Sequence, residues 1–412
     1  MDAGLFGLAS TSEWPVIIQP KGSLGPVSVS ILWWALIIAV LLFSVRIYQS
    51  SRYSTKASVI SKVAAKDLTK IEPIENFDLG STIPPVFRPF KPKYHLTMDK
   101  SCASYVKLPG IETLDRNDWL LFDQTYSERL HLRESLLQQY FDDIVGITNE
   151  SDAKIRLAVQ ELYDYLFQTY LPVRYPTVFK KYEDKNNSRC MLENLLTRQA
   201  LPMTMSDSTP LHIALKTIAQ NVDEDFFILF PRKQGDNSED IYFLEAYAAC
   251  FPSGFQPKEK IGKKLADIHG PVPGYKEKLQ KSMDRFFARL EPGRYVKRVN
   301  WGLTVDEELF SNFDKSAPAF EGKLKKLSVE DLDLDKTFLR CERQTLHRLP
   351  KSGAIVFAFH TYLYPIQEIK AEGSGEDLAQ AIDGLENGSV REMFTYKNGE
   401  KWADAVREFL RS

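Results

Sequence analysis

The 412-residue sequence is poor in cysteine and has no marked excess of either charge. The cysteines are far apart, with no CxxC pair and no metal-type spacing; they are Cys102, Cys190, Cys250 and Cys341. This usage excludes a disulfide-framed secreted fold and a ferredoxin-type iron–sulfur site, and it suits a reducing compartment. The formal net charge of −2 provides no field that would attract a polyanion, so we expect no nucleic-acid partner.

The sequence also lacks the short motifs that carry several common chemistries. It has no P-loop, no GxGxxG dinucleotide fingerprint, no GxSxG nucleophile elbow and no HExxH zinc pair. The run DLDLD at 331–335 contains Asp-x-Asp pairs of the kind with which glycosyltransferases hold a metal, although such pairs are common in turns. A membrane glycosyltransferase is therefore one alternative function.

Charged residues are missing altogether from one long hydrophobic run, residues 27–45 (VSVSILWWALIIAVLLFSV). A helix of this length spans about 28 Å, the thickness of one hydrocarbon core, because it rises ~1.5 Å per residue. We predict a retained transmembrane helix over 27–48 rather than a cleaved signal peptide. No basic region closely precedes the run, and the run is long for a signal core.

Basic residues are unevenly distributed around this run. Only Lys21 precedes it, whereas several follow it: Arg46, Arg52, Lys56, Lys62 and Lys66. By the positive-inside rule we expect a single-pass membrane protein whose large C-terminal part faces the cytosol, with the endoplasmic reticulum as the expected membrane. The chain then divides into a short tail (1–26), the transmembrane helix (27–48), a linker or stalk (49–80) and one domain (81–412).

The first part of the domain is expected to be an extended arm followed by helices. Residues 81–98 are rich in proline and aromatic side chains, which disfavours regular structure and favours an arm packed on the domain. Residues 117–220 are predicted to be mainly helical. Apolar side chains recur there at spacings of three and four: Ile155, Val159, Leu162, Leu166 and Tyr170.

Later segments have the β-branched and aromatic character of strands: FFILF, IYFLEAYAACF, RYVKRVNWGL, KTFLRCERQTL and GAIVFAFHTYLYP. A helical segment, 274–290, lies between the second and the third of them. We therefore predict an α+β domain built around a mostly antiparallel sheet with surrounding helices.

His269 is the sharpest single candidate for a ligand-binding residue. It stands in KLADIHGPVPGY, where a predicted helix over 258–268 ends just before it and two prolines follow it. A rigid backbone lowers the entropy lost when the imidazole binds a ligand. A single structural hydrogen bond is the alternative role for this side chain.

The segment LRCERQ carries charges of both signs where a strand should be half apolar. Arg340 and Arg343 could fix an anion such as a carboxylate or a propionate, with Glu342 orienting one of them. An edge strand with a solvated face is the alternative. In KRVNWG, Arg298 and Asn300 are expected on one face of a strand because side chains alternate.

Long blocks of the sequence resemble the haem-dependent oxidative N-demethylase-like family. The blocks are EKIGKKLADIHGPVPGYKEKLQKSMDRFF, VKRVNWGL and FLRCERQTLHRLPKSGAIVFAFHTYLYP. The resemblance extends to FRPFKPKYHLTM and DEDFFIL, and it covers roughly residues 84–365. Two features depart from the family's pattern: an apparent insertion after TM, and His347 and His360 where relatives are expected to have arginine.

The resemblance implies a PAS-like fold, in which a mostly antiparallel sheet and its helices enclose one b-type haem. It implies that His269 is the axial ligand of the iron. The side chains expected around the cofactor are Arg298, Arg340, Glu342, Arg343 and His360. His360 and a thiolate at Cys341 remain open as alternative axial ligands.

The resemblance further implies a haem-binding oxidoreductase that carries out O₂-dependent oxidative demethylation, or a related monooxygenation, of an amine or small metabolite. Such chemistry needs electrons delivered one at a time, and the sequence shows no flavin or iron–sulfur motif. A separate reductase is therefore an expected partner. A non-catalytic PAS-like haem or gas sensor is the alternative from another class, and the membrane glycosyltransferase is the third.

Overall fold

The computed structural model of the chain describes residues 71–91, 110–184, 189–233, 240–252, 255–305, 309–310, 326–388 and 390–412. The predicted tail, the predicted transmembrane helix and most of the predicted linker lie outside these residues, as do His95 and Cys102. Among the described residues, no helix has the length and apolar character needed to cross a bilayer.

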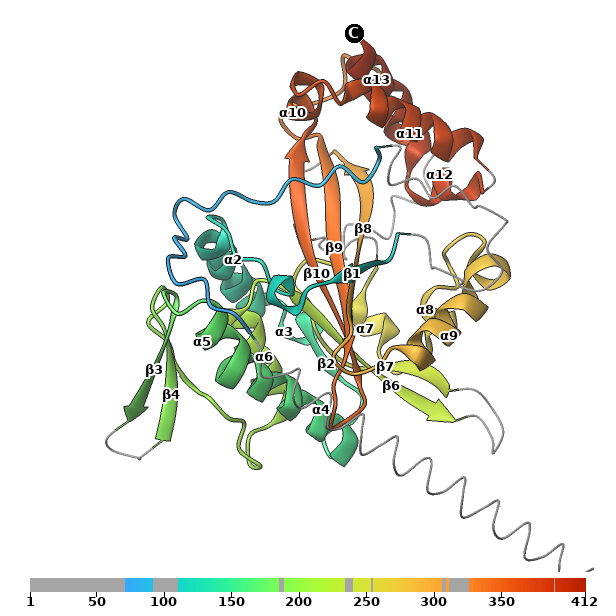
Figure 1. The fold of residues 1–412 in the computed structure, drawn as a ribbon. Helices are drawn as coiled ribbons and strands as arrows, with labels where there is room; N and C mark the ends of the chain where they lie inside the picture. The colour runs from blue at the N-terminus through green and yellow to red at the C-terminus, as the bar shows by residue number, and fades with distance from the viewer. Residues whose placement is uncertain are drawn as a thin grey trace, which may run out of the picture. The chain divides into compact units, whose positions relative to one another are not determined.

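An antiparallel sheet dominates the fold (Figure 1). Its seven strands lie in the order β1 (Glu112–Leu114), β8 (Tyr295–Thr304), β9 (Phe338–Arg348), β10 (Ile355–Pro365), β6 (Asp225–Lys233), β7 (Asp240–Ala248) and β2 (Val145–Ile147). The five strands predicted from the sequence are its five central strands, so the α+β prediction is confirmed. The two edge strands were missed because three residues are too few to show alternation.

Strand β9 lies between β8 and β10, so the alternative that it is a solvated edge strand is wrong. Its pairing with β10 runs without interruption from Phe338 opposite Pro365 to Arg348 opposite Ile355. The turn between these strands closes at Gly353, whose φ of +73° favours glycine. Successive side chains of β9 therefore alternate regularly between two faces of the sheet.

Two sets of helices distinguish these faces. One face, the α9 face, carries Val296, Leu346 and Phe359, which pack against α8 (Leu265–Ile268) and α9 (Gln280–Arg289). The opposite face, the α4 face, carries apolar side chains of β6 and β10 that pack against α2 (Tyr126–Gln139), α4 (Ala153–Asp164) and α6 (Leu211–Asn221). The central sheet is thus covered on both sides, as Figure 1 shows.

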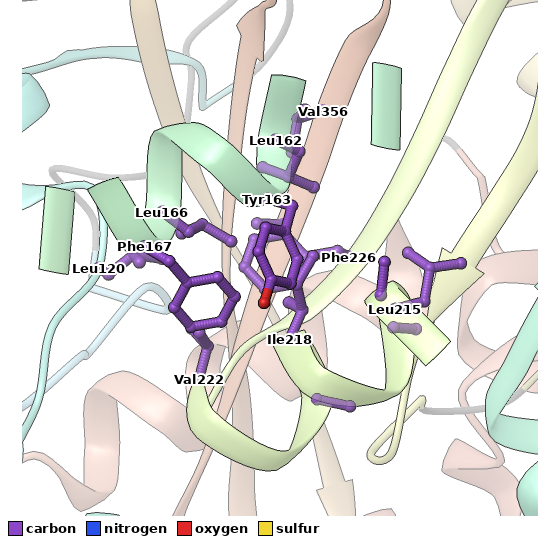
Figure 2. Close-up of a cluster of buried hydrophobic side chains, with 14 of the residues drawn as sticks. Leu120, Leu162, Tyr163, Leu166, Phe167, Leu215, Ile218, Val222, Phe226 and Val356 are labelled. Carbon is purple, nitrogen blue, oxygen red and sulfur yellow. The ribbon is translucent and has the colours of Figure 1, made fainter. Parts of the chain in front are cut away.

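The predicted helical stripe forms the core under the α4 face. All five of its members are buried: Ile155, Val159, Leu162, Leu166 and Tyr170. They lie on α4 and on the π-helical turn η3 (Tyr165–Tyr170), which continues into α5 (Leu171–Arg174). Figure 2 shows Leu162, Leu166 and Phe167 meeting Ile218 of α6 and Phe226 of β6.

The region 117–220 also holds structure that the helical prediction missed. A second antiparallel sheet is formed by β3 (Phe179–Asp184), β4 (Arg189–Asn194) and β5 (Ala200–Pro202). Short helices precede it, η2 (Arg116–Asp118) and α3 (Phe141–Ile144). Helix α6 begins after Pro210, and the carboxylate of Glu150 accepts the N–H groups of Leu211 and His212 at 3.0 and 3.1 Å. The cap thus comes from a distant loop.

The segment before His269 is not one helix. It consists of α7 (Pro257–Lys260) and α8, separated by Gly262 with φ +74°. The intervening backbone pairs with β7, because Gly262 N–H donates to Leu244 O at 2.8 Å and Leu244 N–H donates to Lys263 O at 3.1 Å. The predicted helix over 258–268 is therefore wrong in its middle. After His269 come the π-helical η4 (Tyr275–Leu279) and α9.

The C-terminal helices cover one end of β8–β10 (Figure 1). They are α10 (Ile366–Ala371), α11 (Gly375–Asn387), α12 (Glu392–Tyr396) and α13 (Gly399–Arg411). The described part of the arm, 81–91, contains no helix or strand and packs here through Phe90, which is fully buried next to Trp301. The predicted packed, extended arm is confirmed for this part, and Tyr94 lies outside the described residues.

Candidate functional site

His269 ends α8 on the α9 face, with its imidazole held by two neighbours. Its Nδ1 lies 2.8 Å from the carbonyl oxygen of Leu265, and its ring stacks on Tyr275 at 4.8 Å between ring centres and 11° between planes. Burial and the positive charges of Arg298 and Lys260 lower the pKa of His269, outweighing the bond to Leu265. The ring is therefore neutral at pH 7, and its Nε2 bonds to no residue that the structure describes.

This arrangement suits a metal ligand. A metal-bound histidine commonly donates its second ring N–H to a carbonyl or carboxylate, which fixes the tautomer and leaves the other nitrogen for the metal. With Nδ1–H donating to Leu265, the lone pair of Nε2 is the one left available. No group of three or more His, Cys, Asp or Glu side chains suited to a metal ion occurs among the described residues. A haem iron, however, needs only one imidazole from the protein.

Arg298, on β8, supplies an uncommitted positive charge beside His269. Its guanidinium forms no hydrogen bond or ion pair within the described part of the chain, and the residue is half-buried. Burial lowers the pKa of Arg298, and the charge of Glu342 partly compensates. The Arg298 guanidinium, a planar cation with five N–H donors, is therefore suited to binding a carboxylate ligand.

Glu342, on β9, faces the same side as Arg298 and is 6% exposed. Asn300 lies directly across from Glu342 in the sheet, and Arg298 lies across from Gln344. Both amides approach one carboxylate oxygen: Gln344 Nε2 is 3.0 Å and Asn300 Nδ2 is 3.5 Å from Glu342 Oε2. The other oxygen, Oε1, is buried and has no hydrogen-bond partner among the described residues. The prediction that Arg298 and Asn300 share a face is confirmed, since Val299 and Trp301 pack on the other side.

Lys397 is a half-buried cation at the outer edge of β8, with its ammonium 5.8 Å from the centre of the Trp301 ring, and no sequence pattern singles it out. It lies in the turn between α12 and α13, and its Nζ donates to the backbone carbonyl of Trp301 at 2.5 Å. That carbonyl is available because β1 pairs only with the first residues of β8, 295–297. Burial lowers the pKa of Lys397 to about 8, opposed by the nearby charge of Glu342. The segment YKNGE is polar and has no hydrophobic periodicity, so the sequence does not indicate that Lys397 packs against β8.

Arg340 also projects to the α9 face, but its donors are engaged. Its Nη2 donates to the carbonyl of Phe251 at 2.9 Å, and its Nη1 is 3.4 Å from the carbonyl of Leu309. The side chain is buried at 8% exposure. Arg340 therefore ties β9 to neighbouring loops, in contrast to the unpaired Arg298.

Arg343 and His360 project to the opposite, α4 face, directly across from one another in the sheet. Arg343 donates to the carbonyl oxygens of Trp119 (2.9 Å) and Asp118. His360 places Nδ1 2.5 Å from the carbonyl of Asp223, and burial lowers its pKa to about 3. The six side chains predicted to surround one cofactor therefore divide into two groups separated by the sheet.

The α4-face group belongs to a buried charge network that the run DED (223–225) organises. Arg129 pairs with Asp223, and Arg133 pairs with Asp225 at 2.9 Å. Asp225 also accepts the backbone N–H groups of Cys250 and Phe251 at 2.8 and 2.6 Å. Opposite charges are nearly balanced here, so the network is a structural one that joins α2 to β6, β9 and β10.

Two other predicted features have structural surroundings that differ from those of a metal site. Cys341 is fully buried on the α4 face, its Sγ lies 4.0 Å from the carbonyl of Phe87, and burial raises the pKa of its thiol to about 12. The aspartates of 331–335 shape turns: Asp333 Oδ1 accepts the N–H of Asp335 at 3.1 Å, and Asp335 Oδ1 accepts from Gln367 at 3.1 Å.

On the α9 face, a neutral imidazole lies beside a guanidinium, and within the described ranges neither the imidazole Nε2 nor the guanidinium has a hydrogen-bond partner. This donor set fits a cofactor that carries both a metal and carboxylate groups, which is the description of haem. The sequence model of the family described as haem-dependent oxidative N-demethylase, alpha subunit-like, matches residues 110–407. The match covers well over half of the chain, and the protein belongs to this family of haem-dependent oxidoreductases.

Proposed function

We propose that the protein is a b-type haem monooxygenase that demethylates an amine or a related small metabolite, with His269 as the axial ligand. The observation that carries the proposal is the position of His269 Nδ1, 2.8 Å from the Leu265 carbonyl, which leaves Nε2 free on the face that also presents Arg298. The family match supports haem dependence. The five central antiparallel strands, covered by helices on both faces, support a PAS-like description of the domain.

Each side chain of the α9 face has a distinct role in this proposal. Leu265 and Tyr275 hold the His269 ring in one tautomer and one orientation. Arg298 binds a propionate through its unpaired N–H groups. The apolar side chains of α8, α9 and β10 exclude water from the site, since Leu265, Phe287 and Phe359 are buried together. Bound haem would supply the dioxygen-dependent oxidation of a C–H bond next to nitrogen, from which formaldehyde is released.

Haem attachment is proposed to be non-covalent, because the sequence lacks the CxxCH motif of covalent attachment. The electrons are proposed to come from a separate reductase, because the chain has no flavin or iron–sulfur motif. We place the protein in a membrane through residues 27–48, with the large domain in the cytosol. This proposal rests on the uncharged run and the basic residues that follow it.

The visible absorption spectrum of the purified full-length chain tests the ligand assignment. His269→Ala is expected to abolish or displace the Soret band while leaving the fold intact. His131→Ala is a matched control, because its Nδ1 also lies 2.8 Å from the carbonyl four residues earlier, that of Ser127, but on an exposed surface. If His269→Ala keeps the wild-type spectrum while His360→Ala loses it, the ligand lies on the α4 face and the assignment is wrong.

A non-catalytic haem sensor is the second candidate function, and the same α9-face donor set would serve it. Reconstitution separates the two. An enzyme should consume O₂ and release formaldehyde when reductase and substrate are added, and should do neither with NADPH alone. Reversible gas binding without turnover over a broad panel of methylated amines would favour the sensor.

A further inference from the structure

Basic side chains are concentrated in one part of the chain, residues 257–297, which runs from α7 through α9 to the start of β8. This part contains eleven Lys and Arg residues against five Asp and Glu residues, a formal charge of +6, so the rest of the chain carries −8 and the whole chain −2. A concentration of charge of one sign affects association with partners rather than the fold. His269 lies within the same part of the chain.

Helix α9 carries much of this charge on its outer side. Lys281, Arg285 and Arg289 are four residues apart, so they lie along one side of the helix, and all three are exposed. Phe287 is buried on the other side, in one cluster with Leu265 of α8. The helix is therefore amphipathic, with its apolar side on the sheet and its basic side in solvent. Figure 1 shows α8 and α9 together on one side of the sheet.

Six exposed basic side chains of this part of the chain form no ion pair within the described ranges: Lys263, Lys276, Lys281, Arg285, Arg289 and Arg294. Ion pairs with other elements lie at its two ends, Lys258 with Asp143 at 3.0 Å and Lys297 with Glu112 at 3.8 Å. Four of the six lie on the continuous η4–α9 stretch, and we call Lys276, Lys281, Arg285 and Arg289 the α9 basic surface. Like charges repel one another, so a partner of opposite charge would relieve this repulsion.

The α9 basic surface is next to the candidate axial ligand. Lys276 directly follows Tyr275, whose ring stacks on His269 with 4.8 Å between ring centres. A protein that docks on this surface would therefore lie close to the cofactor. An anionic lipid surface is the other partner that such a charge would attract. The position of the charge favours an electron donor, because electrons have to reach the iron and the same helices hold His269.

We propose that the α9 basic surface docks an acidic electron-transfer protein, which passes single electrons to the haem held by His269. The proposal rests on the proposed function, since it names the surface and the charge of the reductase partner. In each transfer the iron–sulfur cluster or flavin of the donor is oxidised by one electron and the haem iron is reduced by one, and no bond forms or breaks. Complementary charges raise the association rate and orient the encounter.

Calorimetric titration of the full-length, haem-loaded protein with an acidic plant-type ferredoxin tests the docking surface. Binding is expected to weaken as the salt concentration rises from about 0.05 to about 0.5 M, because salt screens exposed charges. Combining Lys281→Glu, Arg285→Glu and Arg289→Glu should weaken binding about tenfold or more at low salt. The corresponding glutamine substitutions should weaken it less. Absence of salt-dependent ferredoxin binding would overturn the proposal.

A matched control separates this surface from the net charge of the protein. Combining Lys154→Glu, Lys180→Glu and Lys336→Glu makes the same change in net charge at exposed positions on other elements, and should alter the affinity by less than about twofold. Equal weakening in both triple variants would refute a specific surface. Phosphatidylserine vesicles test the lipid alternative. If reversal of the three α9 charges abolishes vesicle binding but leaves ferredoxin binding intact, the surface faces a membrane and the proposal is wrong.

Stopped-flow absorption measures the electron transfer itself. Reduced ferredoxin should reduce the haem about tenfold more slowly in the α9 triple variant than in the wild type, while the Soret band and the rate of reduction by dithionite should stay the same. Equal rates with ferredoxin would contradict the proposal. A wild-type protein without a Soret band would refute the haem function instead, and the calorimetric titration would still report whether the α9 basic surface binds an acidic protein.

Discussion

Glu342 and Arg343 are neighbours in the chain but project to opposite faces of the central sheet. Glu342 lies across from Asn300 on the α9 face, where one of its oxygens is unpaired. Arg343 lies across from His360 on the α4 face, where it donates to the Trp119 carbonyl at 2.9 Å. One strand thus contributes to a candidate binding site on one side and to a structural charge network on the other.

This separation predicts different consequences for two arginine substitutions. Arg343→Ala is expected to lower the free energy of unfolding by about 3 kcal/mol or more, because it leaves buried carbonyls and Glu224 without their cation. Arg298→Ala should change the free energy of unfolding by less than about 1 kcal/mol, since its guanidinium has no partner among the residues that the structure describes, but should weaken haem retention. Denaturant unfolding and haem transfer to apomyoglobin measure the two effects. The opposite pattern would place the propionate site on the α4 face.

A second prediction concerns His347, which is buried and stacks on Tyr295, and whose ring nitrogens have no hydrogen-bond partner in the described part of the chain. Burial lowers the pKa of His347 to about 3, so the unfolded chain binds its proton more readily than the folded chain below the unfolded pKa of about 6.5. The folded state is therefore destabilised as the pH falls from about 6.5 toward 3. His347→Phe should reduce the loss of stability between pH 8 and pH 5 by about 2 kcal/mol.

Urea unfolding at the two pH values tests this prediction. The exposed His131→Phe is the control and should leave the pH dependence as it is in the wild type. If His347→Phe loses as much stability between pH 8 and pH 5 as the wild type does, then His347 has a hydrogen-bonded or charged environment in solution.

A third prediction separates the cysteines. Cys341 is buried, and burial raises the pKa of its thiol to about 12, whereas Cys190 is exposed. Because the thiolate is the reactive form, iodoacetamide should label Cys190 in the native protein and Cys341 only after unfolding. Cys341→Ala should retain the Soret band, as detected in a visible spectrum. Loss of the band would revive the thiolate as the axial ligand.

The proposed membrane orientation can be tested through potential glycosylation sites. Asn149 and Asn387 are exposed and lie in N-x-S/T sequons, so nothing steric would prevent their modification in the lumen. With the domain in the cytosol, neither should carry a glycan, and glycosidase treatment should leave the electrophoretic mobility unchanged. A shift that is removed by Asn149→Gln would reverse the orientation.

The sequence predicted the main sheet because its central strands are long and rich in β-branched and aromatic residues. It also predicted the stripe from Ile155 to Tyr170, since a helical period extends over several turns. Alternation along β9 separates Arg343 from Arg340 and Glu342, but it does not show which helices cover each face. Lys397 was out of reach because its position depends on the packing of α11 and α13 rather than on any local pattern.

The turn between β9 and β10 makes the pairing of these two strands sensitive to insertions and deletions. The Glu161 carboxylate of α4 accepts the N–H groups of Lys351 and Ser352 at 2.7 and 2.8 Å, which anchors the turn to a helix on one side of the sheet. Both faces of β9 mix polar side chains with apolar ones, Leu346 on the α9 face and Leu339 on the opposite face, so its hydrophobic pattern specifies the strand pairing only weakly. Deleting one residue next to this anchor would shift the pairing by one position and move Glu342 into the network of Arg129 and Asp223. Natural relatives should therefore tolerate substitutions in this turn far better than insertions or deletions.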